Sequence, residues 1–323
     1  MKVLELKNVS VRYRTEKGFV KAVEGVSFDL KKGETLGLVG ESGCGKSTLG
    51  FAIMKLLPEG TLVEGSIKVD EIDVSSLSNE EMRRIRGSKV SMIFQDPMTS
   101  LNPILRIEDH FVEMILTHRP ELSKEEAKEL AAKALEDVGI NRNRLRDYPF
   151  QFSGGMRQRV MIALSIVLNP AVLIADEPTT SLDVIVQAQI MELLEKLSRE
   201  HNMSMILITH DMGLVAEAAD RIGVMYAGHL VELSTKEKIF TEPLHPYTVA
   251  LLESIPNTDI NDRELKYIPG SPPDLSNPPK GCRFAPRCER VMKVCQEKEP
   301  PEFEVDGTRV KCWLYGGDQN GSD

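Results

Sequence analysis

Residues 40–48 carry the clearest chemistry in the sequence, Gly-Glu-Ser-Gly-Cys-Gly-Lys-Ser-Thr, and they match the pattern G-x-x-x-x-G-K-[ST] in full. Glycines in such a turn let successive backbone N–H groups point into one concavity, which suits an anionic phosphate. The lysine of this pattern reaches the β- and γ-phosphates of a nucleotide, and the next hydroxyl ligates Mg²⁺. We therefore predict ATP contacts from Gly40, Ser42, Gly43, Cys44, Gly45, Lys46, Ser47 and Thr48, with Ser47 also on Mg²⁺.

The neighbouring segments place this loop between a strand and a helix. Residues 35–39 form a short apolar run typical of a buried strand, and residues 46–57 have a helical pattern that stops before Pro58. The start of a helix adds partial positive charge beside the phosphates. Cys44 fills an unconstrained position of the loop, so we interpret it as a bystander and not as a nucleophile. Because kinases, GTPases and many ATPases share such a loop, it predicts only nucleotide binding.

A second group of acids follows an apolar run at residues 171–175, which ends in Asp176 and Glu177. A buried strand with Asp at its carboxyl end supplies the Mg²⁺-side carboxylate of a phosphate-loop enzyme. The next acid, Glu177, would face the γ-phosphate and polarise the attacking water. The pair therefore predicts hydrolysis of Mg-ATP, with Asp176 on the metal and Glu177 as a catalytic residue.

About twenty residues before this strand, residues 152–156 read Phe-Ser-Gly-Gly-Met. With the phosphate loop and the acids, they resemble the ATP-binding subunits of ABC transporters, whose signature is usually Leu-Ser-Gly-Gly-Gln. The resemblance implies that Ser153, Gly154 and Gly155 contact the γ-phosphate held by a partner subunit, so that ATP joins two subunits. Met156 replaces the usual Gln, which affects side-chain contacts but leaves the backbone donors in place.

Further motifs of this family occur in the expected order. Gln95, in Ile-Phe-Gln-Asp-Pro at 93–97, resembles the Q-loop residue that contacts Mg²⁺ and ATP and links them to the membrane partner. Asp183, in Ser-Leu-Asp at 181–183, resembles the D-loop that crosses the dimer interface. His210 resembles the switch histidine and is expected to act with Glu177 in catalysis. Tyr13 is expected to stack on adenine, and Phe19 is the nearby rival for that role.

Composition bounds the class of protein. The 323 residues exceed one average domain, and 41% hydrophobic with 28% charged residues is ordinary for a globular protein. The net charge of −9 argues against a general nucleic-acid binder. The longest apolar stretches are too short to cross a bilayer, and the first residues lack the plan of a secretory signal. We expect a cytosolic chain that acts peripherally at the cytoplasmic face of the membrane, with other chains crossing it.

The periodicity predicts an α/β fold, a phosphate-loop NTPase core of the ABC ATPase type. Alternating residues at 3–11 and 20–30 predict strands of an antiparallel β subdomain, and residues 104–145 are helical in pattern. Strands and helices alternate from 171 to 226, which indicates a mainly parallel sheet covered by helices. We expect an ABC ATPase domain at 1–255, with a helical subdomain at about 96–159, followed by a C-terminal metal-binding extension at 256–323.

The region after residue 240 narrows the subfamily. Pro-Leu-His-Pro-Tyr-Thr at 243–248 and the proline-rich segment 269–279 resemble the C-terminal region of peptide-importer ATPases, which serve oligopeptide, dipeptide and nickel uptake. The resemblance implies a peptide importer, with nickel or another small solute as the alternative cargo. Its implied partners are a second ABC ATPase subunit, usually a different chain, two transmembrane permease subunits and an extracytoplasmic substrate-binding protein, with no nucleic acid. A soluble ABC ATPase is disfavoured, because the chain has one ATPase unit and no coiled-coil arm.

Four cysteines crowd the extension, namely Cys282, Cys288, Cys295 and Cys312. Four thiolates can hold Zn²⁺ or an iron–sulfur cluster. Structural zinc sites favour paired C-x₂-C hairpins, which are absent, so the wider spacing favours a [4Fe–4S] cluster, as the resemblance also suggests. Zn²⁺ and free or disulfide-bonded cysteines remain the alternatives. Either metal would chiefly staple a segment with little core of its own.

Overall fold

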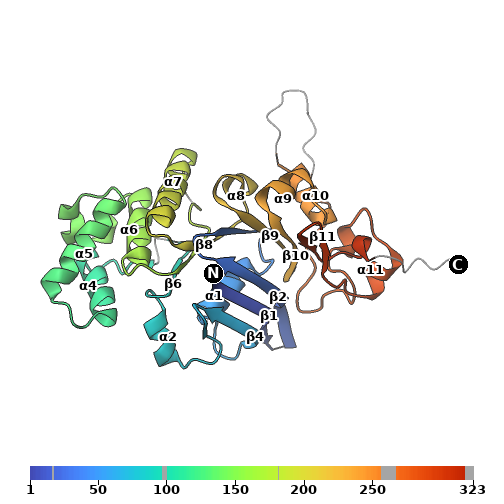
Figure 1. Cartoon of the computed structure of the whole chain (residues 1–323), viewed down its shortest axis with the longest axis horizontal. Helices are drawn as coiled ribbons and strands as arrows, with labels where there is room; N and C mark the ends of the chain where they lie inside the picture. Colours follow the sequence, from blue (N-terminus) through green and yellow to red (C-terminus); the bar gives the residue numbers. More distant parts are fainter. Residues whose placement is uncertain (17, 97–99, 181, 256–266, 317–323) are drawn as a thin grey trace. The chain divides into compact units, whose positions relative to one another are not determined.

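The structure, a computed structural model, describes residues 1–16, 18–96, 100–180, 182–255 and 267–316 (Figure 1). The chain divides into two compact units, each built from segments that lie far apart in the sequence. Unit 1 comprises residues 1–5, 29–35 and 67–208, and unit 2 comprises residues 6–28, 36–66 and 209–323. The predicted boundary after residue 255 adjoins residues 256–266, which lie outside the described part.

A four-stranded sheet contributes strands to both units, in the order β2-β1-β4-β5. Its members are β1 (Lys2–Thr15), β2 (Gly18–Lys31), β4 (Leu62–Val69) and β5 (Ile72–Asp73). Along β2, Val26, Phe28 and Leu30 are buried in alternation, as the period of two in the sequence predicts, whereas β1 also buries neighbouring residues such as Val3 and Leu4. Both extend beyond the predicted ranges of 3–11 and 20–30.

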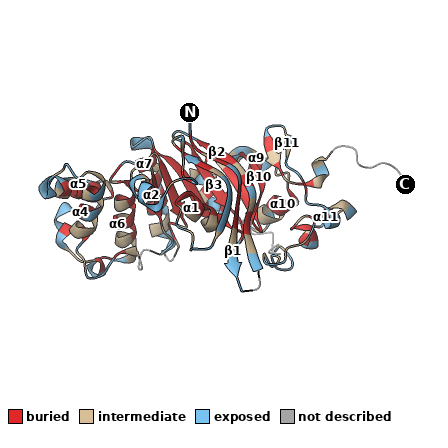
Figure 2. Ribbon diagram, turned by 90° about the horizontal axis from the view of Figure 1, so that it is seen from below, coloured by how far each residue is buried: buried red, intermediate tan, exposed pale blue. Residues whose placement is uncertain are grey.

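Unit 1 contains three parallel strands in the order β8-β7-β6. These are β6 (Val90–Ile93), β7 (Val172–Asp176) and β8 (Ser204–Thr209). Every residue of the three strands is buried, which explains why they appear in the sequence as continuous apolar runs and not as alternation. Figure 2 colours buried residues red, and the strands near the labels β2, β3 (Thr35–Val39) and β10 (His229–Thr235) are mostly red.

Helices make up the rest of unit 1. They are α2 (Asn79–Ile85), α4 (Ile107–His118), α5 (Lys124–Asp137), α6 (Gly154–Ile166) and α7 (Val184–Glu200), with the short 3-10 turns η1 (Arg142–Arg146) and η2 (Pro149–Gln151). The helices α4, α5 and α6 pack against one another (green in Figure 1) and bury Phe111 and Leu135. The predicted capping box of Ser123 with Glu126 is present at the start of α5.

Unit 2 contains strands in the order β11-β12-β10-β9-β3. They are β3 (Thr35–Val39), β9 (Arg221–Tyr226), β10 (His229–Thr235), β11 (Phe303–Val305) and β12 (Thr308–Val310). Among the described strands of this unit, β3 and β9 pair in parallel, whereas β10, β11 and β12, which follow the predicted range of 171–226, pair antiparallel. The reason is the tight turn at Ala227 and Gly228, where φ is 46° and 87° and the chain reverses into β10.

The helices of unit 2 are short. They are α1 (Lys46–Ile53), α8 (Met212–Ala218), α9 (Lys236–Thr241), α10 (Pro246–Glu253) and α11 (Lys293–Glu297), with the 3-10 turns η3 (Ala285–Arg287) and η4 (Trp313–Tyr315). The helix α1 ends before the predicted residue 57, because the chain leaves the helical region at Lys55, where φ is 50°. Among the described residues, no helix is both long and apolar enough to span a membrane.

Candidate functional site

The phosphate loop connects β3 to α1 within unit 2, as the sequence predicts, and its glycines have the backbone angles that the turn requires. Gly40 and Gly45 have φ of 150° and 104°. A Cβ at Gly40 would lie 2.1 Å from the carbonyl oxygen of Met225, and one at Gly45 would lie 2.4 Å from that of Ala22. Only glycine fits at these two positions, because any side chain would collide with backbone.

Lys46 lies inside this loop with its side chain almost wholly buried. Its Nζ donates to the carbonyl oxygens of Gly40 at 2.7 Å and of Glu41 at 3.1 Å. The ammonium group therefore occupies the concavity in which a phosphate is expected. On nucleotide binding it would exchange these carbonyl oxygens for phosphate oxygens, which carry more negative charge.

Tyr13 is the aromatic residue that the structure brings to this loop. Its hydroxyl donates to Oγ1 of Thr48 at 3.1 Å, so the ring lies beside the first turn of α1. The side chain of Phe19 is 39% exposed, on β2. The contact places Tyr13 at the loop, and its stacking on adenine stays a prediction, with Phe19 as the alternative.

Cys44 has the surroundings of a bystander. Its side chain is buried, and burial raises the pKa of the thiol above its usual value. The neutral thiol is a poor nucleophile, so the chemistry of the loop rests on Lys46 and the backbone.

The acids of unit 1 lie at the carboxyl end of β7. Asp176 ends the strand and is 2% exposed. Glu177 follows in a left-handed conformation with φ of 45°, and its N–H donates to the carbonyl oxygen of Ile208 at 2.8 Å. Its Oε2 accepts from Nε2 of Gln95 at 3.0 Å and from Oγ1 of Thr180 at 2.9 Å. The structure thus brings Gln95 and Glu177 together, because β6 and β7 are neighbours and end at the same edge of the sheet.

The signature turn begins α6, also in unit 1. Ser153 is the N-cap residue, and its hydroxyl accepts from the N–H of Met156 at 3.4 Å. Asp183 caps α7 in the same way by accepting from the N–H of Val186 at 3.0 Å. A Cβ at Gly155 would lie 2.8 Å from Cγ1 of Val186, so the signature and the residues around Asp183 are close neighbours. Ser181, the first residue of the predicted D-loop, lies outside the described residues.

Two side chains tie the signature helix to its surroundings in unit 1. Gln158 is buried and donates through Nε2 to the carbonyl oxygen of Pro178 at 2.7 Å, directly after Glu177. Met156, where the family usually has Gln, accepts through its sulfur from Nη1 of Arg144 at 3.6 Å. The first two turns of α6 are therefore tied to residues on both sides, Pro178 and Arg144.

His210 follows β8 and belongs to unit 2, and its side chain is exposed. The next residue, Asp211, caps α8 by accepting from the N–H of Gly213 at 2.7 Å, and its own N–H donates to Oγ1 of Thr209 at 3.0 Å. These bonds fix the backbone on which His210 is presented at the end of the strand.

Comparison with known proteins gives matches along the chain. The family described as "ABC transporter" matches residues 23–180, and the "Oligopeptide/dipeptide transporter, C-terminal region" matches residues 231–295. The dipeptide transport ATP-binding protein DppD of Bacillus subtilis is 51% identical over 97% of this chain and 95% of its own length. The oligopeptide transport ATP-binding protein OppD of the same organism is 50% identical over 98% and 90%. The chain belongs to the oligopeptide/dipeptide group of ABC transporter ATP-binding subunits.

Solved structures agree with this assignment for the ATPase part. The ATP-binding cassette MJ0796, in a dimeric post-hydrolysis state with ADP and phosphate, has a TM-score of 0.65 and 30% identity over 72% of this chain and 98% of its own. A structure of cbiO1 from Clostridium perfringens has a TM-score of 0.64 and 27% identity over 75% and 91%. The predicted α/β ABC ATPase fold is confirmed, and as a member of this family the chain is an ATPase.

The structure adds contacts to this ABC ATPase that sequence reasoning missed. The N–H of Glu41 in the phosphate loop donates to the hydroxyl of Tyr247 at 3.0 Å. The Glu41 carboxylate is also paired with Arg287, which lies between two of the C-terminal cysteines. In the sequence, the one feature that could have drawn attention to Arg287 is its position directly before Cys288. No local pattern relates Arg287 or Tyr247 to the phosphate loop.

The C-terminal cysteines of the ABC ATPase lie near one another within unit 2. The N–H of Cys282 donates to the carbonyl oxygen of Cys295 at 2.8 Å. Burial, as the largest cause, raises the pKa of Cys282 to about 11. Burial together with the neighbouring thiols of Cys282, Cys288 and Cys295 raises the pKa of Cys312 to about 12. Even so, no three His, Cys, Asp or Glu residues of the described part are grouped so that they could hold a metal ion.

Proposed function

We propose that this ABC ATPase hydrolyses ATP to drive the uptake of dipeptides or oligopeptides. The two Bacillus subtilis relatives match this chain over nearly their whole length. They are named dipeptide and oligopeptide transport ATP-binding proteins, and these names support peptides as the cargo. The observation that carries the ATPase role is the buried Lys46 in a strand–loop–helix turn, and Glu177 bonded to Gln95 supports it.

ATP is held at the phosphate loop of one subunit. Tyr13 stacks on the adenine. The phosphates are bound by Gly40, Ser42, Gly43, Cys44, Gly45, Lys46, Ser47 and Thr48. Ser47, Gln95 and Asp176 hold Mg²⁺ through oxygen atoms, the ligands that this ion prefers. Gln95, whose Nε2 donates to Glu177, would be one of the residues that hold the ion. Mg²⁺ supplies charge neutralisation of the phosphates when it is bound.

Hydrolysis requires a second subunit. Glu177 polarises the attacking water and His210 assists at the γ-phosphate, while Ser153, Gly154, Gly155 and Asp183 contact the ATP held by the partner. Ser153 caps α6, so that Gly154 and Gly155 form its first turn, where the partial positive charge of a helix start suits an anion. Closure of the dimer around two ATP molecules would then be the step that moves the membrane subunits.

The assembly follows from the transporter group. We infer a second ABC ATPase subunit, a different chain, together with two transmembrane permease subunits and an extracytoplasmic substrate-binding protein. The chain would be peripheral, at the cytoplasmic face of the membrane. Domain bounds of 1–255 for the ATPase and 256–323 for the extension are part of the same proposal.

We further propose that Cys282, Cys288, Cys295 and Cys312 hold a [4Fe–4S] cluster and not Zn²⁺. In support, the four cysteines lie in one stretch of unit 2, the N–H of Cys282 donates to the carbonyl oxygen of Cys295 at 2.8 Å, and the thiols of Cys282, Cys288 and Cys295 are close enough to Cys312 to raise its pKa. The four residues are not paired as C-x₂-C hairpins, which favours a cluster over zinc.

Glu177→Gln tests the ATPase proposal in the complete transporter. The variant should bind Mg-ATP as the parent does and lose at least about 100-fold in turnover, because the amide cannot polarise water. Peptide uptake should be lost with turnover. Glu192→Gln, the same change at an exposed position of α7, should leave both unchanged. Near-parental hydrolysis by Glu177→Gln would remove this residue from catalysis.

Anaerobic purification tests the cluster. A broad absorption band at about 400 nm, with iron and sulfide bound, is expected for the parent. Cys282→Ser should lose the band and Cys44→Ser should retain it, since Cys44 lies in the phosphate loop. If the parent protein is colourless and holds one zinc ion per chain, the cluster proposal is wrong and the four cysteines bind zinc.

A further inference from the structure

Arg287 connects the C-terminal region to the phosphate loop. Its guanidinium pairs with the Glu41 carboxylate through two bonds, Nη1 to Oε2 at 2.8 Å and Nη2 to Oε1 at 2.9 Å. Such two-pronged pairs fix the relative orientation of both groups as well as their distance. Glu41 is the second residue of the phosphate loop, so this bond reaches the site where ATP is expected.

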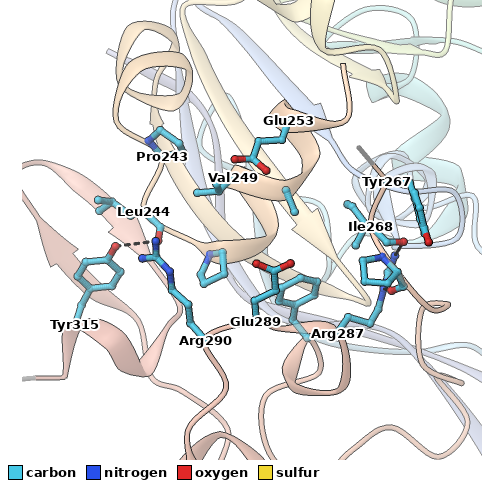
Figure 3. Close-up of a pocket in the computed structure, with 14 residues that line it drawn as sticks. Pro243, Leu244, Val249, Glu253, Tyr267, Ile268, Arg287, Glu289, Arg290 and Tyr315 are labelled. Atoms are coloured by element: carbon cyan, nitrogen blue, oxygen red, sulfur yellow. Dashed lines mark hydrogen bonds between the residues drawn. The ribbon is translucent and has the colours of Figure 1, made fainter. Parts of the chain in front are cut away.

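The other donors of Arg287 are also used. Nε donates to the carbonyl oxygen of Pro269 at 2.8 Å, Nη2 to that of Ile268 at 3.3 Å, and Nη1 to the hydroxyl of Tyr226 at 3.2 Å. Figure 3 shows Arg287 beside Ile268, at the edge of a cavity of about 460 Å³. The side chain is buried and held in one orientation, which makes it a fixed support for Glu41.

Glu41 is held at its backbone as well. Its N–H donates to the hydroxyl of Tyr247 at 3.0 Å, and its carbonyl oxygen accepts from Lys46 Nζ at 3.1 Å. Tyr247 is fully buried and packs against Tyr226 and Phe284, with ring centroids 4.6 Å and 5.4 Å away. Arg287 and Tyr247, which both lie after residue 240, thus bind the side chain and the backbone of Glu41 respectively.

The charge of Glu41 gives this grip a consequence for nucleotide binding. The loop is built to hold a polyanion, and Glu41 places a carboxylate within it, next to Gly40. Like charges repel, and the repulsion is stronger where groups are partly removed from water. The Arg287 cation neutralises the carboxylate and, being bonded also to the carbonyl oxygens of Pro269 and Ile268, holds it in place. The groups left to meet the phosphates are then Lys46 and the backbone N–H groups of the loop.

We propose that Arg287 is a positioning residue for ATP, which neutralises Glu41 and holds the phosphate loop open for the triphosphate. On this reading, which rests on the proposed ATPase function, the C-terminal region is part of the nucleotide site. It contributes to ATP affinity and not to the hydrolytic step.

Equilibrium binding of Mg-ATP to the full-length chain, purified anaerobically, tests the proposal. Arg287→Ala should weaken binding about ten-fold, because the carboxylate is left unpaired beside the phosphates. The loss should shrink as ionic strength rises. Glu41→Gln should bind at least as tightly as the parent, and the double variant E41Q/R287A should return to within about two-fold of it, since no unpaired carboxylate remains.

Further variants separate charge from structure. Arg287→Lys keeps the charge without the fork, and should lose about three-fold. Arg309→Ala is the matched control: it removes a two-pronged pair with Glu302, at 2.8 Å and 2.7 Å, in the same C-terminal region, and should not change ATP affinity. Rescue by E41Q/R287A would also show that the Ala variant is folded.

Several results would overturn the proposal. Equal weakening of Arg287→Ala and the double variant would assign Arg287 a structural role only, as would an Arg287→Lys variant as weak as Arg287→Ala. Parental affinity in Arg287→Ala would show that the pair does not act on the nucleotide. If the parent itself fails to bind Mg-ATP, the proposed ATPase function is wrong as well. A parent that binds Mg-ATP, with parental affinity in Arg287→Ala, would contradict only the role of Arg287.

Discussion

The phosphate loop and the C-terminal region lie in the same unit but obtain their structure in different ways. The loop is nine consecutive residues, and its shape follows from glycines at fixed positions and from the lysine that bonds its own carbonyl oxygens. The C-terminal region is assembled by partners far away in the sequence. Arg283 donates to the carbonyl oxygen of Ala227 and pairs with Glu24 at 3.5 Å, and β12 pairs with β10.

This difference shows where each region is vulnerable. A local turn loses stability when a substitution is incompatible with its backbone angles. A region held by distant contacts loses stability when the burial or the charge of a contacting residue changes.

The largest effect is expected from a methyl group in the loop. Gly40→Ala would place a Cβ 2.1 Å from the carbonyl oxygen of Met225, at φ of 150°, so strand β9 or the loop must move. We expect a loss of about 3 kcal/mol in the free energy of unfolding. Gly43→Ala is the matched control, because its Cβ meets nothing within 4 Å. It should cost only about 1 kcal/mol, from its φ of 77°.

Denaturant titration of the two variants measures the contrast, with Mg-ATP binding followed in parallel. Gly40→Ala should also lose ATP affinity, whereas Gly43→Ala should retain more of it. Equal losses of stability in both would show that backbone angle alone, and not the contact with β9, sets the demand for glycine at position 40.

The second effect depends on pH and concerns His245 at the start of α10. Burial lowers the pKa of His245 to about 3, from an ordinary value of 6.5. As pH falls from 6.5, the unfolded chain binds a proton at this residue while the folded chain does not. Stability is therefore fully present above pH 6.5 and is lost toward pH 3, with a loss of about 2 kcal/mol by pH 5.

In the parent, Nδ1 of His245 accepts a hydrogen bond from the N–H of Tyr247 at 3.0 Å. His245→Asn removes the titrating group and keeps a side-chain acceptor for this N–H. The variant should lose less stability between pH 7 and pH 5. The slope should not vanish, because burial also lowers the pKa of His229. Glu232 contributes the opposite slope, since burial raises its pKa, but parent and variant share it.

Unfolding measured across this pH range checks the expectation. The exposed His201, which ends α7 in unit 1, supplies the control: His201→Asn should leave the slope of the parent unchanged. An unchanged slope in His245→Asn would mean that acid sensitivity arises elsewhere in the chain.

The two regions also differ in how far the sequence predicted them. The phosphate loop, its strand and its helix were predictable because the pattern is contiguous and its backbone demands are local. The pairing of Arg287 with Glu41 was not, because the residues are 246 positions apart and no periodicity relates them. The strand β10 was missed for a similar reason, since an Ala-Gly turn carries a weaker hairpin signal than Asn-Gly.

The acids of unit 1 form an intermediate case. The resemblance to ABC ATPases predicted that Gln95 and Glu177 act at the same ATP site, Gln95 on Mg²⁺ and Glu177 on the attacking water. Their hydrogen bond at 3.0 Å depends on β6 and β7 being neighbours in the sheet, although Gln95 and Glu177 are 82 positions apart in the sequence. Sequence predicted the parts of this site, and sheet order decided which of them touch.

The smallest effect concerns the aromatic residue at the loop. If Tyr13 stacks on adenine, Tyr13→Ala should weaken Mg-ATP binding about ten-fold, because a stacked aromatic ring contributes about 1–3 kcal/mol per base. Tyr13→Phe keeps the ring and loses only the bond to Thr48, so it should stay within about two-fold of the parent. Phe19→Ala should have no effect on affinity. The reverse pattern, a loss in Phe19→Ala with parental binding in Tyr13→Ala, would move the adenine to Phe19, and would mean that the Tyr13 hydroxyl serves only to hold β1 against α1.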